Sequence, residues 1–205
     1  MRLRGRDLAC VRGGREVFSG VSFGIEAGSL IKLRGPNGAG KSSLLRLVAG
    51  LLRPSAGDLD LDGGPEDVPI AEQAHYVGHL DTLKPALTVL ENLGFWADML
   101  GGTRATAGAA LERAGLAPLA DFPAGILSAG QRRRLALARL AAAPRPLWLL
   151  DEPTTAIDAA ARDRLFVLIH DHLDAGGLVM IATHDDLPVE GQTLQLGAAP
   201  PGAGA

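Results

Sequence analysis

The sequence predicts an α/β protein with a parallel β core, an antiparallel β element near its N-terminus and a small helical lobe. Two continuous apolar runs, "PLWLL" (146–150) and "LVMIAT" (178–183), are typical of strands that are buried on both faces of a sheet. Segments with strand character alternate with segments of helical periodicity, which favours parallel strands joined by helices. The first 30 residues differ, because they read as short strands separated by turns.

The elements of the first half follow in order. "DLACV" and "VFSGVSFGI" are strands on either side of the turn "RGGR", and "EAGS" is another turn. "LIKLR" (30–34) is a strand that runs into the glycine-rich "GPNGAG", and a helix begins at about Lys41. "RPSAGDLDLDG" is a turn followed by an alternating edge strand, and "HYVG" (75–78) is a further strand. The helix that begins at about Lys41 is predicted from the helical spacing of its apolar residues, which are Leu44, Leu47, Val48 and Leu51.

The second half contains more helix. "ALTVLENLGFWADML" is a predicted helix in which Thr88 is the cap and Glu91 follows three residues later, and Ser128 and Gln131 have the same spacing at the start of "SAGQRRRLALARLAAA". Residues 101–125 are rich in alanine and glycine and predict short helices. The helix "AAARDRLFVLIHDHLDA" should stop at the following glycine pair, and "QTLQL" is a candidate last strand.

Length and composition limit the possible classes of protein. The 205 residues fit one domain over 1–196, with a helical lobe at about 80–140 and a disordered tail over 197–205. A formal net charge of −3 argues against a general nucleic-acid binder. The single cysteine, Cys10, excludes an internal disulfide and favours a reducing cytosolic setting. No window approaches the ~18–20 apolar residues that cross a bilayer, and the N-terminus does not resemble a secretory signal. We therefore expect a soluble chain that can attach to a membrane through a partner.

The stretch "GPNGAGKS" (35–42) carries the strongest chemical signal. It matches G-x-x-x-x-G-K-[ST] between a strand and a helix, which is the context of a phosphate-binding loop. Glycines let the backbone N–H groups face a phosphate, the Lys41 ammonium can reach the β- and γ-phosphates, and the Ser42 hydroxyl can ligate Mg²⁺. A glycine-rich turn with a surface lysine is the alternative, which the context makes the weaker one. The predicted ATP-binding residues here are Gly35, Pro36, Asn37, Gly38, Ala39, Gly40, Lys41, Ser42 and Ser43.

Three further segments are candidates for functional roles when they are considered together with this loop. Asp151 and Glu152 end a buried strand, so they should lie at the same sheet edge as the loop, where Asp151 can hold the Mg²⁺ shell and Glu152 can deprotonate the attacking water. "LSAGQ" (127–131) opens a helix and can form a second anion site, although a well-capped helix is the alternative. His184 follows an apolar strand and can contact the γ-phosphate, although an isolated histidine at a strand end is usually structural.

Together these motifs resemble the ATP-binding-cassette (ABC) ATPase family. The order is that of the family: phosphate loop, signature "LSAGQ", Walker B "LWLLDE", a D-loop "TAID" with Asp158, and a switch histidine, His184. In this family two cassettes enclose two ATP molecules, and each phosphate loop faces the signature of the other subunit. The resemblance therefore implies a dimer with signature residues that act in trans: Ser128, Ala129, Gly130 and Gln131.

A more specific resemblance is to the ATP-binding subunit of the bacterial cytochrome c maturation system, a haem exporter. "VFSGVSF", "GPNGAGKSSLLRLVAGLLRPSAG", "YVGH", "LSAGQRRRLALARL" and "LWLLDEPTTAID" carry it. It implies a subunit on the cytoplasmic face of the inner membrane, with integral membrane partners and, indirectly, a periplasmic haem chaperone. The alternatives are the ATPase of another small-substrate transporter, a soluble ABC ATPase without a transport role, and a different P-loop enzyme, which would not need "LSAGQ".

Three positions depart from the family pattern. Ala129 replaces the usual glycine of the signature, and Arg12 stands where many cassettes stack an aromatic ring on adenine, a contact that a guanidinium plane can also make. His79 replaces the Q-loop glutamine, and a neutral imidazole can offer its nitrogen to Mg²⁺ or to water in the same way. We expect activity to fall as this imidazole is protonated, and His79→Gln should remove that acid limb. His75 lies four residues earlier on a predicted strand, about 13 Å away, so the two histidines cannot share a metal.

Overall fold

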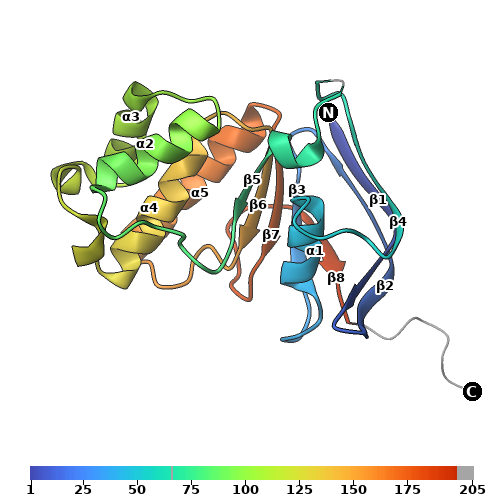
Figure 1. Cartoon of the computed structure of the whole chain (residues 1–205). Coiled ribbons are helices and arrows are strands. Elements are labelled where there is room, and N and C mark those ends of the chain that lie inside the picture. Colours follow the sequence, from blue (N-terminus) through green and yellow to red (C-terminus); the bar gives the residue numbers. More distant parts are fainter. Residues whose placement is uncertain (66, 198–205) are drawn as a thin grey trace, which may run out of the picture.

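The computed structural model describes residues 1–65 and 67–197, which form two sheets and the helices around them (Figure 1). The larger sheet has five strands in the order β5-β6-β7-β3-β8, and each pair of adjacent strands in it is parallel. The smaller sheet has three antiparallel strands in the order β2-β1-β4, as the sequence predicted for the N-terminal region. The strands are β1 (Arg2–Arg12), β2 (Arg15–Glu26), β3 (Leu30–Arg34), β4 (Ala56–Asp62), β5 (Ala74–Val77), β6 (Leu147–Asp151), β7 (Leu178–Ala182) and β8 (Gln192–Gln195).

The helices cover the parallel sheet from two sides. Helix α1 lies between the two sheets, whereas α4 and α5 cover the opposite face and α2 and α3 pack on α4 (Figure 1). None of the helices in the described part of the chain is long and apolar enough to span a bilayer. The helices are α1 (Lys41–Val48), α2 (Val89–Met99), α3 (Arg104–Arg113), α4 (Ala129–Ala142) and α5 (Ala159–Asp174), with short 3-10 turns at Ile70–Gln73, Ala117–Leu119 and Ala124–Ile126.

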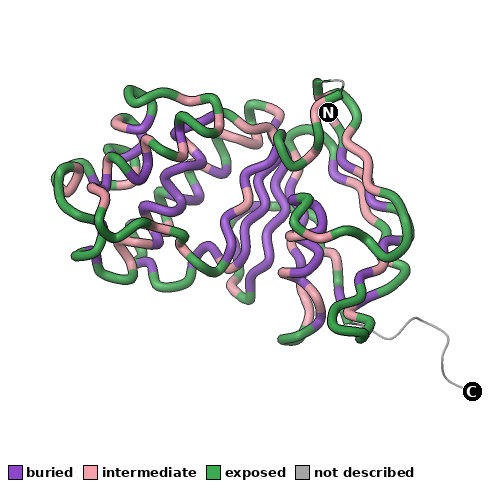
Figure 2. Tube along the Cα trace, in the orientation of Figure 1, coloured by how far each residue is buried: buried purple, intermediate pink, exposed green. Residues whose placement is uncertain are grey.

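The central strands are buried on both faces, as their continuous apolar runs predicted. Along β6, Leu147 and Leu149 belong to the core shared with α1, whereas Trp148 and Leu150 belong to the core under α4 and α5. All five residues of this strand are buried, and the central strands are the most continuously buried part of the trace (Figure 2). Because successive side chains of a strand point to opposite faces, one short strand supplies both cores.

The helical region has a core of its own. Leu93 of α2, Leu111 of α3 and Leu135 of α4 are each almost completely buried in it. Thr88 and Ser128 cap their helices with the side-chain pairs that the sequence predicted. The buried residues of this core run from Val89 to Ala142, and the domain limits remain a prediction. The predicted disordered tail lies, apart from Gly197, outside the described residues.

The end of α1 differs from the prediction. Periodicity placed Leu51 on the helix, but α1 ends at Val48 and Leu51 is 61% exposed. Gly50 has φ +72°, and this left-handed residue turns the chain before Leu51 can join the apolar face. The strand predicted at 75–78 is also shifted by one residue, because β5 runs from Ala74 to Val77.

Candidate nucleotide site

The loop between β3 and α1 needs glycine for its shape. Gly40 precedes α1 with φ +97°, a conformation that L-residues with side chains rarely adopt. A Cβ atom on Gly40 would also lie 2.8 Å from side-chain atoms of Val17 and Phe18 in β2. Gly35 is equally constrained, because its Cβ would lie 2.3 Å from the Leu196 carbonyl oxygen. The loop can therefore bring its backbone against a ligand at the start of α1.

Lys41 lies over this loop. Its Nζ donates to the carbonyl oxygens of Gly35 at 2.7 Å and Pro36 at 3.1 Å, and it lies 3.4 Å from Nε2 of His184. The residue is 8% exposed, so most of its stem is packed while its ammonium points into the loop. The positive charge is thus placed where the loop and the helix start would hold a phosphate.

Ser42 and Asp151 are brought together from opposite halves of the chain. Ser42 Oγ donates to Asp151 Oδ1 at 3.0 Å, and the carboxylate, at the end of β6, is 4% exposed. Mg²⁺ prefers oxygen ligands and is usually held by one or two carboxylates together with the substrate's phosphates. A hydroxyl and a carboxylate at hydrogen-bond distance, beside a phosphate-type loop, fit that ion.

Glu152 follows with an unusual backbone. Its φ of +48° places a non-glycine residue in the left-handed region, where such strain commonly occurs at functional sites. The Glu152 N–H donates to the Ala182 carbonyl at 2.8 Å, which ties the turn to β7. Its Oε1 lies 3.7 Å from His184 Nε2, and the side chain is 27% exposed. The carboxylate can therefore meet water while its backbone is fixed.

His184 joins the two halves of the site. Its Nε2 lies 3.2 Å from Asn37 Oδ1 in the loop and 3.7 Å from the Glu152 carboxylate. The Lys41 ammonium, 3.4 Å from Nε2, fits a nitrogen that accepts, whereas the Asn37 oxygen at 3.2 Å fits the tautomer that carries a proton on Nε2. In this form His184 can donate to an oxygen of a bound phosphate.

These groups line one concavity of about 730 Å³. The volume is within the range of small-molecule sites. Residues Arg15 and Glu16 of the β1–β2 hairpin also line it, and the sequence did not single them out. The predicted residues that line the concavity are Arg12, Asn37, Gly38, Gly40, Lys41, Ser42, Ser43, Asp151, Glu152 and His184.

Other predicted residues lie outside this concavity. Ser128 Oγ accepts the N–H of Gln131, and Gln131 Oε1 accepts the N–H of Ser128, so these side chains close a capping box. Gly130 packs on the D-loop, because a Cβ there would lie 2.8 Å from the Ala156 carbonyl. Asp158 caps α5 by accepting the N–H of Ala161 at 2.7 Å.

The two histidines of the "AHYVGH" segment have different environments. His75 is inside β5, is 2% exposed and has Nε2 2.9 Å from the Ala143 carbonyl, so that nitrogen donates and is not a ligand. Burial lowers the pKa of His75 to about 4. His79 follows β5 and is exposed, and it does not line the concavity. The pair does not share a helix, as the strand character predicted.

Sequence reasoning missed two arginines beside the site. Arg34 ends β3 and donates to the Thr183 and Asp185 carbonyls, at 3.1 and 2.7 Å, on either side of His184. Arg133 is buried on α4 and contacts the ends of β5 and β6. In the sequence both arginines are ordinary members of an arginine-rich chain, and their contacts span distant segments.

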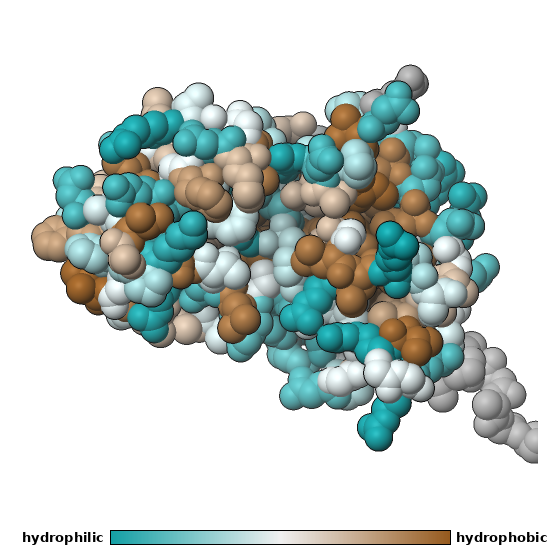
Figure 3. All heavy atoms as spheres, viewed as in Figure 1, coloured by the Kyte–Doolittle hydropathy of each residue, from teal (hydrophilic) through white to brown (hydrophobic). Residues whose placement is uncertain are grey.

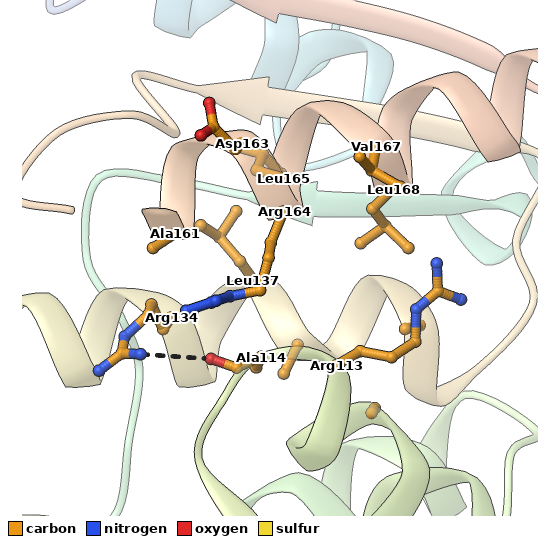
Figure 4. A pocket seen from close by; sticks show the side chains of 13 residues that line it. Arg113, Ala114, Arg134, Leu137, Ala161, Asp163, Arg164, Leu165, Val167 and Leu168 are labelled. Atoms are coloured by element: carbon orange, nitrogen blue, oxygen red, sulfur yellow. Dashed lines mark hydrogen bonds between the residues drawn. The ribbon is translucent and has the colours of Figure 1, made fainter. Parts of the chain in front are cut away.

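A separate apolar cavity of about 300 Å³ lies between α3, α4 and α5. Leu137, Leu165 and Leu168 line it, and Arg134 at its edge donates to the Ala114 carbonyl (Figure 4). It shares no lining residue with the nucleotide concavity.

The fold and the site define an ATP-binding cassette of the P-loop class. A family model described as "ABC transporter" matches residues 18–155. The cytochrome c biogenesis ATP-binding export protein CcmA from Rhodopseudomonas palustris (strain BisB5) is 55% identical to this chain, over 97% of this chain and 100% of its own length. The protein of the same name from Bradyrhizobium diazoefficiens is 54% identical, over 96% of this chain and 98% of its own length. The chain belongs to the ABC transporter family and, within it, to the family of cytochrome c biogenesis ATP-binding export proteins.

Solved structures agree with this assignment. An ATP-binding protein from Pyrococcus furiosus that is assigned to an ABC transporter has a TM-score of 0.82 at 26% identity, covering 96% of this chain and 98% of that one. A dimeric ATP-binding cassette in a post-hydrolysis state, bound to ADP and Pi, has a TM-score of 0.77 at 26% identity, covering 89% and 88%. The predicted α/β class and the predicted family are both confirmed.

Proposed function

We propose that this chain is the ATP-hydrolysing subunit of a membrane ABC transporter complex of cytochrome c biogenesis. ATP hydrolysis by this subunit powers haem export or the release of a haem-loaded periplasmic chaperone. The observation that carries the proposal is the convergence of Lys41, Ser42, Asp151, Glu152 and His184 in one concavity. The names of relatives that are more than half identical over nearly the whole chain support the biological setting.

Each residue has a role toward ATP that follows from its chemistry. The Lys41 ammonium and the loop N–H groups hold the phosphates, and the plane of Arg12 stacks on the base. Ser42 and Asp151 hold Mg²⁺, which when bound neutralises charge on the phosphate oxygens. Glu152 accepts the proton of the attacking water, and His184 donates to the γ-phosphate from Nε2. His79 does not line the concavity, so its role as a ligand of Mg²⁺ or water depends on a movement of its segment.

A second copy of the chain completes each site. The signature residues Ser128 to Gln131 do not line the concavity of their own chain, which supports their acting on the ATP of a partner copy. Ala156 of the D-loop lies beside Gly130, and Asp158, two residues later, caps α5. The dimeric cassette with ADP and Pi provides a structural precedent for such a pair.

The helical region provides a surface for integral membrane partners. Leu80, Phe95 and Met99 are 78%, 45% and 53% exposed, and Lys84 lies over the Phe95 ring at 4.6 Å. Hydrophobic and hydrophilic residues are interspersed over this region on the face shown in Figure 3. The chain thus acts as a peripheral subunit at the cytoplasmic face of the inner membrane. Affinity purification from detergent-solubilised membranes should recover multi-span partners with the wild type and lose them with Phe95→Asp.

Glu152→Gln tests the proposed activity directly. The amide keeps the shape and the neighbouring Asp151 charge but cannot accept the proton, so turnover should fall roughly 10²–10⁴-fold while ATP affinity is kept. Steady-state phosphate release and equilibrium ATP binding measure the two effects. A Glu152→Gln turnover within a few-fold of wild type would reject Glu152 as the base, and a wild type without ATP hydrolysis would reject the function itself.

A further inference from the structure

Arg133 links three functional segments through one guanidinium group. It is the fifth residue of α4 and is 4% exposed. Its Nη2 donates to the carbonyl oxygens of Asp151 and Glu152, both at 2.8 Å. Its Nη1 donates to the Gly78 carbonyl at 2.7 Å and to Asp81 Oδ1 at 3.3 Å. The signature helix, the segment 78–81 and the end of β6 therefore meet at this side chain.

Stability alone does not account for this residue. Burying a guanidinium removes its hydration, and replacing a buried ion pair by apolar side chains is often neutral or stabilising. The Asp81 carboxylate is its charged partner at 3.3 Å, and its Nε is buried without a hydrogen-bond partner among the described residues. The well-made contacts are those to backbone carbonyls, so the geometry of Arg133 serves the orientation of those peptides.

Of these peptides, that of Glu152 depends most on being held in place. A left-handed φ of +48° at a glutamate persists only when the surroundings hold it. The Ala182 carbonyl holds the Glu152 N–H on one side, and Arg133 holds the Glu152 C=O on the other. These two anchors set the direction in which the carboxylate leaves the backbone. Without the second anchor Glu152 can relax toward an ordinary φ and carry its carboxylate away from the water.

The same guanidinium also donates hydrogen bonds to the segment that contains His79. Gly78 and Asp81 lie on either side of His79 and both accept from Nη1. A displacement of this segment, or of the start of α4, must therefore strain or break bonds on the group that also holds Glu152. The link is a direct one, through a single rigid, planar group.

We propose that Arg133 is a positioning residue for Glu152 and makes the rate of hydrolysis depend on the placement of segment 78–81. The proposal rests on the proposed ATPase function. A misplacement of about 1 Å in a reacting group can lower a rate by about 10²-fold, which sets the scale of the effect.

Arg133→Lys is the main test, because it keeps the charge but one ammonium cannot hold both pairs of acceptors. We expect kcat to fall by roughly 10- to 100-fold while the Kd for ATP stays within about two-fold of wild type. Arg133→Gln, which keeps an amide donor without the charge, should behave in the same way if the lysine variant is unstable. Thermal unfolding with ATP shows that each variant is folded and binds nucleotide.

Arg139→Met is the matched control. Arg139 is also a buried arginine of α4, and it donates to the Tyr76 carbonyl and lies over the Trp96 ring at 4.9 Å. Its loss should lower the Tm without lowering kcat per folded molecule. A kcat loss in Arg139→Met equal to that in Arg133→Lys would mean that any damage to α4 slows hydrolysis, and it would overturn the specific role of Arg133.

A double mutant separates positioning from other roles. If Arg133 acts through Glu152, adding Arg133→Lys to Glu152→Gln should change the residual rate by no more than about two-fold. A further loss as large as in the wild-type background would overturn the proposal, and so would a wild-type kcat in Arg133→Lys. A wild type that does not hydrolyse ATP is a different result, because it rejects the proposed function on which this inference depends.

Discussion

Helices α1 and α4 begin in opposite ways, although both starts are proposed to face ATP. Helix α1 begins after Gly40, which has no side chain to offer the first N–H groups. Helix α4 begins at Ser128, whose side chain and that of Gln131 satisfy each other's backbone N–H groups. The first start leaves its N–H groups for a ligand, whereas the capping box of the second already satisfies the Ser128 and Gln131 N–H groups.

The two helices are also stabilised differently. Helix α1 has eight residues, too few to be stable alone, and it is held by burial between the two sheets. Helices α2, α3 and α4 each begin with a capping box, and α4 is further tied by Arg133 and Arg139 from its flank and by His75 at its end. Tertiary burial holds both helices, and the signature helix gains local caps and buried polar contacts in addition.

Among the variants that compare the two helices, the largest expected effect is on ATP affinity at the start of α1. Lys41→Ala removes the ammonium that lies over the loop, and a hydrogen bond to a charged group contributes roughly 1.5–3 kcal/mol. With two phosphates in reach, the Kd for ATP should rise roughly 10²–10³-fold, measured by equilibrium binding at fixed salt. Lys32→Ala, in the preceding strand, is the charge-matched control and should bind ATP as the wild type does. Equal affinity in both variants would remove Lys41 from the site.

The next-largest expected effect is on the pH dependence of stability. It arises at the C-terminal end of α4, where His75 donates to the Ala143 carbonyl. Its pKa of about 4 in the folded state is below the value of about 6.5 for an unfolded histidine. Between these values the unfolded chain binds a proton that the folded chain does not, so stability is lost as pH falls from about 6.5 to about 4. From about pH 7 to about pH 5 this group should cost roughly 2 kcal/mol of the free energy of unfolding.

His75→Gln isolates that contribution. The amide can still donate to the Ala143 carbonyl but does not titrate, so the variant should lose less stability over this interval in urea unfolding. Burial also lowers the pKa of His172, which remains in both proteins and cancels in the comparison. Identical pH dependence in the two proteins would show that His75 is not buried as a neutral imidazole.

The smallest effect in magnitude is a factor of about two, but it decides whether the start of α4 acts on its own chain. If Ser128 acts in trans, a mixed dimer of a Lys41→Ala chain and a Ser128→Arg chain places both defects in one ATP site and leaves the other intact. About half of the wild-type turnover should then remain. The bulky cation opposes the helix dipole and blocks the γ-phosphate.

The reciprocal dimer is the control for this experiment. A double mutant chain, Lys41→Ala with Ser128→Arg, paired with a wild-type chain should lose both sites if the signature acts in trans. If the signature acts in cis, the two results exchange: the first dimer is inactive and the second keeps half of the turnover. Tagged subunits purified in two affinity steps make both measurements possible.

The sequence by itself determined the elements and the identity of the chemical groups. The loop at 35–42, the apolar strand that ends in Asp151, and the caps at Thr88 and Ser128 are local patterns, because a turn, a strand or a cap is decided by residues a few positions apart. The family resemblance added their arrangement, and the structure brought them together at the predicted sheet edge.

Only the tertiary structure decided which side chains support those groups. Ser42 and Asp151 are separated by 109 residues, Arg34 and Asp185 by 151, and Arg133 and Gly78 by 55. The reach of a long side chain depends on how helices and strands pack, and no local pattern distinguishes Arg133 from Arg132 or Arg134. Burial of His75 as a neutral donor was decided in the same way, since only packing removes its water.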